Sequence, residues 1–204
     1  PNGALLKSLT GGIPVQLLGG NRVRVQWTGM KPTAEIKAMD MLARARNLVD
    51  FKAALHHFQI GAMNWVVTTS KGDIGYFARA DYPIRQKLDP KHPPYGVTPA
   101  EGYDFSGKLI PDNHVPQLFN PASGFIVTAN NDPVGNSRDG NIFNDRYYLG
   151  FTYDSGFRAA RLVEQISAQI KAGKKFTPEQ MQTLQMDNYS RVGDHLVKRL
   201  ALAW

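Results

Sequence analysis

Two adjacent asparagine side chains, Asn130 and Asn131, are the residues of this chain whose type and position best suit chemistry. They follow a short apolar run, residues 124–129, which predicts a buried strand that ends by presenting them. A side-chain amide donates N–H groups and stays neutral at every working pH, so it can stabilise a developing oxyanion without adding a titrating group. The same pair also suits an Asx turn before Pro133, and residue type alone favours the turn.

The commoner catalytic and metal-binding signatures are absent from the sequence. The chain has no cysteine, which excludes disulfides, thiol catalysis and cysteine-ligated zinc. It also lacks a G-x-S-x-G elbow, a P-loop, an H-E-x-x-H motif and a G-x-G-x-x-G motif. His56 and His57 are adjacent on an expected helix and so point in different directions, and the other histidines are far apart in sequence. The histidines therefore give no metal or catalytic site.

The chain is basic, with a formal net charge of +7, which raises the question of a nucleic-acid partner. The basic residues are scattered, however, and the densest run, residues 171–175, lies between two expected helices. We therefore expect no nucleic-acid partner. No run of about 18 apolar residues is present, so no membrane span is expected either. A content of 42% hydrophobic and 20% charged residues predicts a folded domain rather than a disordered segment.

The first half of the chain predicts a strand, two helices and a hairpin. Residues 22–27 alternate between polar and apolar, which is typical of a half-buried strand. A helix is expected over residues 32–47, and a second one, over residues 50–58, begins with an aspartate that can cap it. Two β-rich runs, residues 65–69 and 74–78, flank a glycine-bearing turn and predict a β-hairpin.

The second half predicts a long loop followed by helices. Eight prolines between residues 81 and 122 argue against regular structure through most of that region, so a long ordered loop is expected there. Residues 157–170 have helical periodicity, and Thr177 with Gln180 forms a capping box at the start of the next helix. A last helix carries apolar residues at 192, 196 and 200. This mixed order of strands and helices predicts an α+β fold.

Two stretches of the sequence resemble the β-chain of the penicillin amidase family, which includes penicillin acylases, cephalosporin acylases and acyl-homoserine-lactone acylases. The first has the form N-W-x6-G-x-I-G-Y followed by Y-P-x-R, and the second has the form N-P-x-x-G-x-I followed by N-N-x-P. The residues that match, in order, are Asn64, Trp65, Gly72, Ile74, Gly75, Tyr76, Tyr82, Pro83, Arg85, Asn120, Pro121, Gly124, Ile126, Asn130, Asn131 and Pro133. Similar segments continue to about residue 200.

The resemblance implies a particular fold and site. The fold is part of the αββα four-layer sandwich of N-terminal-nucleophile hydrolases, with a helical C-terminal part. All of residues 1–204 would be one fragment of a larger β-chain, with residues 22–133 in the sandwich and residues 156–204 helical. The family's oxyanion asparagine corresponds to Asn130. An arginine that orients it is expected at Arg161, with Arg158 as the alternative three residues earlier.

The resemblance also implies the reaction and its setting. Family members cleave the amide bond of N-acyl substrates, such as β-lactam side chains or acyl-homoserine lactones, through an N-terminal serine, which we expect upstream of Pro1. The chemistry needs no cofactor. Some members bind calcium, and the carbonyl of Pro90 with the carboxylate of Asp139 (Asp145 as alternative) resembles that site.

The expected partners are the α-chain and the rest of the β-chain of the same precursor, together with a small N-acyl substrate. The expected location is the bacterial periplasm or outside the cell. The isolated fragment is expected to be inactive. A non-catalytic binding or structural module on the same scaffold is the alternative.

Overall fold

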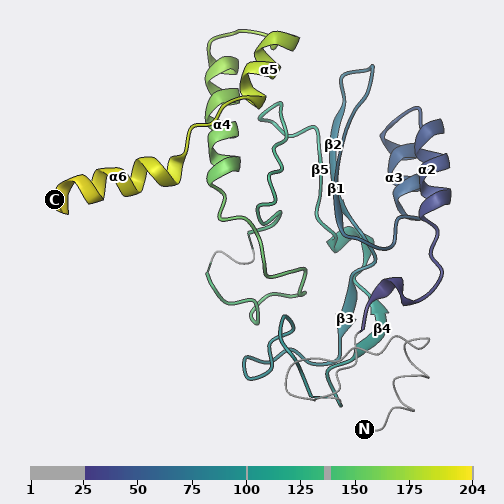
Figure 1. The fold of residues 1–204 in the computed structure, drawn as a ribbon. Coiled ribbons are helices and arrows are strands. Elements are labelled where there is room, and N and C mark those ends of the chain that lie inside the picture. The colour runs from purple at the N-terminus through teal and green to yellow at the C-terminus, as the bar shows by residue number, and fades with distance from the viewer. Residues whose placement is uncertain (1–25, 100, 136–138, 204) are drawn as a thin grey trace. The chain divides into compact units, whose positions relative to one another are not determined.

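A computed structural model describes residues 26–99, 101–135 and 139–203 (Figure 1). Most of the strand expected over residues 22–27 lies outside these ranges, and Gln26 and Trp27 belong to no strand. The chain forms two compact units, one made of Pro1–Phe119 with Asn136–Phe151 and the other of Asn120–Gly135 with Thr152–Trp204. Residues 120–133 belong to the second of these units.

The first unit contains a three-stranded antiparallel sheet. Its strands are β1 (Met63–Thr68), β2 (Ile74–Arg79) and β5 (Gln117–Phe119), in the order β1-β2-β5. The predicted hairpin is confirmed, since Thr68 lies opposite Ile74. Gly72 in the connecting turn has φ +89°, a conformation that favours glycine.

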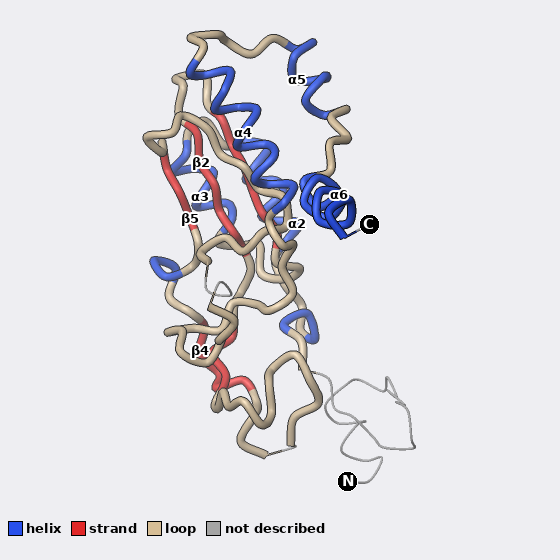
Figure 2. Tube along the Cα trace, turned by 90° about the vertical axis from the view of Figure 1, so that its left-hand side faces the viewer, coloured by secondary structure: helices blue, strands red, loops and turns tan. Residues whose placement is uncertain are grey.

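Two helices, α2 (Glu35–Arg44) and α3 (Leu48–Leu55), pair with each other and supply the helical side of the core (Figures 1 and 2). The core of this unit contains Ala38, Leu55, Phe58 and Phe77, with Trp65 packed edge-on against Phe58. Alternation along β1 and β2 turns one set of side chains toward these helices.

The capping aspartate that we expected at position 50 is placed differently. α3 begins at Leu48, and the side chain of Asn47 caps it by accepting from the Asp50 backbone N–H at 2.9 Å. Asn47 has extended backbone, as an N-cap residue does, whereas Asp50 already lies within the first turn. The Asp50 carboxylate instead accepts from the Arg46 N–H, so it supports the helix start from inside.

The proline-rich region is only partly irregular. It contains β3 (Pro83–Arg85) and β4 (Phe105–Leu109), which form a second, two-stranded sheet, and it also contains β5. Short 3-10 turns η1 (Thr28–Met30) and η2 (Asp112–His114) complete the unit. Pro83 is tolerated in β3 because a strand of a two-stranded sheet has a free edge, where the missing N–H costs no ladder hydrogen bond.

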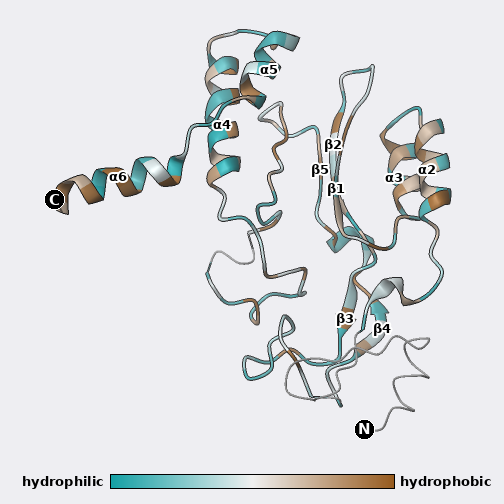
Figure 3. Cartoon of the chain, viewed as in Figure 1, coloured by the Kyte–Doolittle hydropathy of each residue, from teal (hydrophilic) through white to brown (hydrophobic). Residues whose placement is uncertain are grey.

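The second unit contains three helices, α4 (Phe157–Lys171), α5 (Pro178–Gln185) and α6 (Arg191–Ala203). The predicted capping box at α5 is confirmed by reciprocal hydrogen bonds between Thr177 and Gln180. α6 is amphipathic, and its apolar side chains Val192, Leu196 and Leu200 are exposed by 40%, 54% and 66% (Figure 3). No helix in the described ranges has the length and apolar character needed to cross a bilayer.

The prediction of a strand over residues 124–129 is wrong. Within the described part of the chain this run pairs with no strand, and a single parallel bridge, between Asn131 and Asp154, follows it. A β-rich composition is not sufficient, because a strand also needs a neighbour to receive its hydrogen bonds. The fold is therefore α+β with small sheets, as expected from the order of elements.

Candidate active site

Asn130 directly follows residues 124–129 and has a left-handed conformation, with φ +61°. Asparagine tolerates this region better than most residues with a side chain. The carbonyl of Asn130 accepts a hydrogen bond from the Asp154 N–H at 2.8 Å, just before α4. The backbone of Asn130 is thereby held against the segment that begins the helix, and its side chain is exposed.

Arg158, in the first turn of α4, binds the side chain of Asn130. Its Nη2 donates to Asn130 Oδ1 and to the Ala129 carbonyl, each at 2.9 Å. A guanidinium only donates, so the amide atom facing it must be the oxygen. The Nδ2 group of Asn130 consequently points elsewhere, and it finds no acceptor within the described ranges. The pair thus presents a neutral, oriented N–H donor.

Asp154 is the residue of this site that the sequence analysis missed. Its Oδ2 accepts from Nε and Nη2 of Arg158, each at 3.2 Å, and its Oδ1 accepts from the Gly156 N–H at 2.9 Å. Asp154 therefore holds both the arginine and the backbone of Asn130. The signal available in the sequence was its position four residues before Arg158, the spacing of an ion pair at a helix start.

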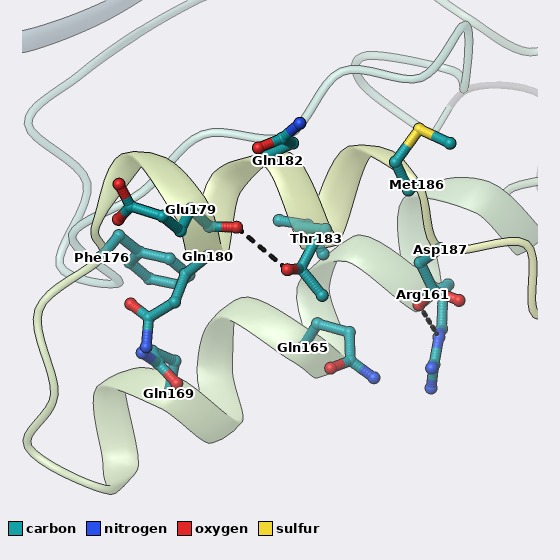
Figure 4. Close-up of a pocket in the computed structure, with 11 residues that line it drawn as sticks. Arg161, Gln165, Gln169, Phe176, Glu179, Gln180, Gln182, Thr183, Met186 and Asp187 are labelled. Atoms are coloured by element: carbon teal, nitrogen blue, oxygen red, sulfur yellow. Dashed lines mark hydrogen bonds and ion pairs between the residues drawn. The ribbon is translucent and has the colours of Figure 1, made fainter.

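Arg161, the expected orienting arginine, contacts other residues than Asn130 in the described ranges, so its catalytic role stays a prediction. Its Nε donates to Asp187 Oδ2 at 2.7 Å (Figure 4). Its guanidinium also lies 4.4 Å from the centre of the Tyr189 ring. Hydrogen bonding to Asp187 raises the pKa of Arg161. Three residues carry a helix about 4.5 Å along its axis, so Arg161 reaches the segment after α5 while Arg158 reaches the Asn130 segment.

A groove of about 780 Å³ lies between α4 and α5, and Arg161 is one of its lining residues (Figure 4). Half of its other lining side chains are polar but uncharged, among them Gln165, Gln169 and Gln180. Neither Asn130 nor Arg158 lines it. The groove is therefore distinct from the candidate active site, although both use residues of α4.

Asn131 behaves as a turn residue. Its Oδ1 accepts from the Ala129 N–H at 3.1 Å and its Nδ2 donates to the Asp132 carbonyl at 3.4 Å. Both polar ends of this amide are thus used locally. The two interpretations that the sequence left open therefore divide between the two residues: Asn131 forms the turn, and Asn130 presents its amide.

The residues suggested for calcium form no complete site on their own. The Asp139 carboxylate accepts from the Asn141 N–H at 2.9 Å and from Asn144 Nδ2 at 2.7 Å, and these bonds lower its pKa. In the part of the chain that the structure describes, no group of three or more acidic or histidine side chains is arranged to hold a metal. Pro90 and Asp139 would need further oxygen ligands, so calcium binding stays a prediction.

The fold and the sequence both relate this chain to known acylases. A solved structure of the thermostable penicillin G acylase from Alcaligenes faecalis superposes with a TM-score of 0.54 at 21% identity, over 74% of this chain and 25% of that one. Penicillin G acylase from Escherichia coli is 32% identical over 108 residues, which are 52% of this chain and 12% of that protein.

The structural likeness defines the fold of the chain as related to part of a penicillin G acylase. The profile of the penicillin amidase family matches residues 2–203, so the chain belongs to the penicillin amidase family. The chain spans only about an eighth of the Escherichia coli relative and a quarter of the Alcaligenes faecalis chain.

Proposed function

We propose that this chain is part of an amidohydrolase that cleaves the amide bond of N-acyl substrates, with Asn130 as a donor to the oxyanion. The observation that carries the proposal is the hydrogen bond from Arg158 Nη2 to Asn130 Oδ1. It removes the amide oxygen from the open side of the site and leaves Nδ2 to donate. A donor held in advance stabilises the tetrahedral intermediate without reorganising during the reaction, which is the source of its catalytic value.

Arg158 and Asp154 act on this donor indirectly. Arg158 holds the amide, and Asp154 fixes Arg158 by accepting from two of its nitrogens. The positive charge of Arg158 also polarises the amide, which makes the Nδ2–H groups better donors. A carboxylate at Asp154 balances that charge, so the site places no unpaired cation beside the reacting carbonyl.

The rest of the machinery belongs to the parent polypeptide. We propose that its nucleophile is an N-terminal serine, whose own α-amino group acts as general base. The sheet of the first unit would then be one part of an αββα sandwich that the remaining polypeptide, including an α-chain, completes. A structural calcium near Pro90 and Asp139 and a periplasmic or secreted location extend the same proposal. Family membership supports each of these points.

The test is hydrolysis of a panel of linear N-acyl amides by the full-length parent and its Asn130→Ala variant. We expect kcat to fall by roughly 100-fold or more in the variant, the usual scale for removing one oxyanion donor. Asn188→Ala is the matched control, since Asn188 is also an exposed amide but makes no contact with Asn130 or Arg158. We expect the control to retain the wild-type kcat.

Equal kcat in Asn130→Ala and wild type would contradict the assignment of Asn130. A parent that folds but hydrolyses no amide of the panel would instead favour the non-catalytic module.

A further inference from the structure

Arg85, which ends the Y-P-x-R motif, has an environment that the proposed reaction does not explain. It lies in β3 directly opposite Phe105 of β4. Its guanidinium carbon is 5.4 Å from the centre of the Phe105 ring and 5.4 Å from the centre of the Tyr148 ring. The side chain is therefore held between two aromatic groups, within the first unit of the chain.

The guanidinium of Arg85 has no acceptor among the residues that the structure describes. Across residues 26–99, 101–135 and 139–203, no hydrogen bond or ion pair involves its five N–H donors. Other half-buried arginines of this chain are paired: Arg79 binds Asp112 at 3.2 Å and the Leu55 carbonyl at 2.9 Å, and Arg161 binds Asp187. Withdrawing a charge from water without a partner is costly, so the unpaired state of Arg85 calls for a partner from outside these residues.

The chemistry of the missing partner follows from what surrounds Arg85. Aromatic rings interact with the positive charge through their faces, but they do not accept its N–H groups as an oxygen does. The unused donors form a planar fork that matches the two oxygens of a carboxylate. The rings also displace water, which strengthens a charge-assisted hydrogen bond made there.

We propose that Arg85 binds a carboxylate. One source is an acidic side chain elsewhere in the polypeptide, because this chain spans only a quarter of the related solved chain. The other is a free organic acid, the class of compound released by amide hydrolysis; this second source alone rests on the proposed function. The chemistry at Arg85 is the same in both cases.

The experiment compares the full-length parent with its Arg85→Gln and Arg146→Gln variants. Arg146 is the matched control because it lies 5.4 Å from the centre of the Tyr147 ring but is exposed and contacts one ring only. Arg85→Gln loses two ring contacts and Arg146→Gln loses one, but neither loss depends on pH, so only an acid-sensitive difference between the two variants indicates a carboxylate partner. Should Arg85→Gln fail to fold, Arg85→Lys keeps the charge and loses the planar fork, and serves in the same comparison.

The two sources give different readouts, neither of which uses hydrolysis. A polypeptide carboxylate predicts that Arg85→Gln lowers Tm at neutral pH more than Arg146→Gln does. That excess should disappear between about pH 5 and about pH 3, as the partner carboxylate is protonated. A free acid predicts that benzoate raises the Tm of wild type but not of Arg85→Gln, and that neutral benzamide raises neither.

Two results together would overturn the proposal. In the first, the decrease in Tm caused by Arg85→Gln does not exceed that of Arg146→Gln in a way that depends on pH. In the second, benzoate shifts the Tm of wild type and Arg85→Gln by the same amount. Because no arm measures turnover, this result would leave the proposed amidohydrolase function untouched. Conversely, an inactive Asn130→Ala variant carries no information about Arg85.

Discussion

At the scale of single residues, the structure separates two arginines that the sequence left almost equivalent. Arg158 and Arg161 lie on the same helix, yet one binds Asn130 and the other binds Asp187. Asp187 also accepts from the Tyr189 N–H, which together with Arg161 lowers its pKa. Arg161 therefore connects α4 to the segment between α5 and α6, whereas Arg158 contacts the amide that we propose as the oxyanion donor.

This difference gives a prediction for the full-length parent, which rests on the proposed function. Arg158→Gln should lower kcat by roughly 10-fold or more, because the Asn130 amide then loses the contact that keeps Nδ2 outward. Arg161→Gln should leave kcat near wild type and lower Tm, because it breaks the bond to Asp187. Steady-state kinetics on the same N-acyl substrate and thermal melts of both variants provide the measurement.

The reverse pattern, with Arg161→Gln slow and Arg158→Gln fast, would return the orienting role to Arg161. Arg158→Lys adds a further check, since a lysine keeps the charge but cannot bind Asn130 and Asp154 through a planar fork. We expect it to recover only part of the lost rate.

At the scale of elements, one carboxylate connects the start of α2 to the segment that follows α3. Glu35 accepts from the Thr33 hydroxyl and from the backbone N–H groups of Gln59 and Ile60, the last two at 2.9 and 3.0 Å. The hydrogen bond from Thr33 and those backbone bonds lower the pKa of Glu35 to about 2, from an ordinary value of 4.5. All three donors prefer the ionised carboxylate.

The sign of the pH effect follows from this lowered pKa. A carboxyl group whose pKa is lower in the folded state stabilises that state fully above its unfolded value of 4.5 and loses the effect as pH falls toward about 2. We therefore predict that the stability difference between the parent and its Glu35→Gln variant shrinks on acidification. Urea unfolding midpoints between about pH 6 and about pH 3 measure it. A difference that stays constant across that range would show that the carboxylate is not preferentially ionised in the folded protein.

At the scale of the whole molecule, the chain has more basic than acidic side chains, but the basic residues are scattered along the sequence. In the described ranges several of them are paired with carboxylates, as for Lys52 with Asp112, Lys87 with Asp89 and Lys198 with Asp194. Salt-dependent binding to nucleic acid requires several basic groups free to contact successive phosphates. The charge of +7 is therefore better explained as a distributed excess than as a binding face.

We accordingly predict no specific binding of duplex DNA by the parent. Fluorescence anisotropy of a labelled duplex should show no saturable binding at about 150 mM salt. Weak binding at low salt, lost steeply as salt is added, is expected of any basic protein. Saturable binding that persists at physiological salt would contradict the prediction and support the hypothesis of a nucleic-acid partner.

Local patterns were predictable because neighbouring residues determine them. The hairpin around Gly72, the capping box of Thr177 and Gln180, and the periodicity of α4 and α6 each depend on residues within one or two turns of each other. The α+β class followed from the order of these elements. The family resemblance likewise rested on short motifs with conserved spacing along the chain, and the family profile confirms it.

The remaining features depended on contacts between residues far apart in sequence, and only the tertiary structure decided them. Residues 124–129 have the composition of a strand but pair with no neighbour in the described ranges. β5 lies in the proline-rich region and yet pairs with β2. The sequence does not distinguish Arg158 from Arg161, because both side chains carry the same hydrogen-bond donors. Which of them reaches Asn130 is set by where the helix begins relative to a segment 28 residues away, and Asp154 sets that start. The sequence determines the chemistry of each side chain, but only the tertiary structure determines which group lies close enough for that side chain to contact.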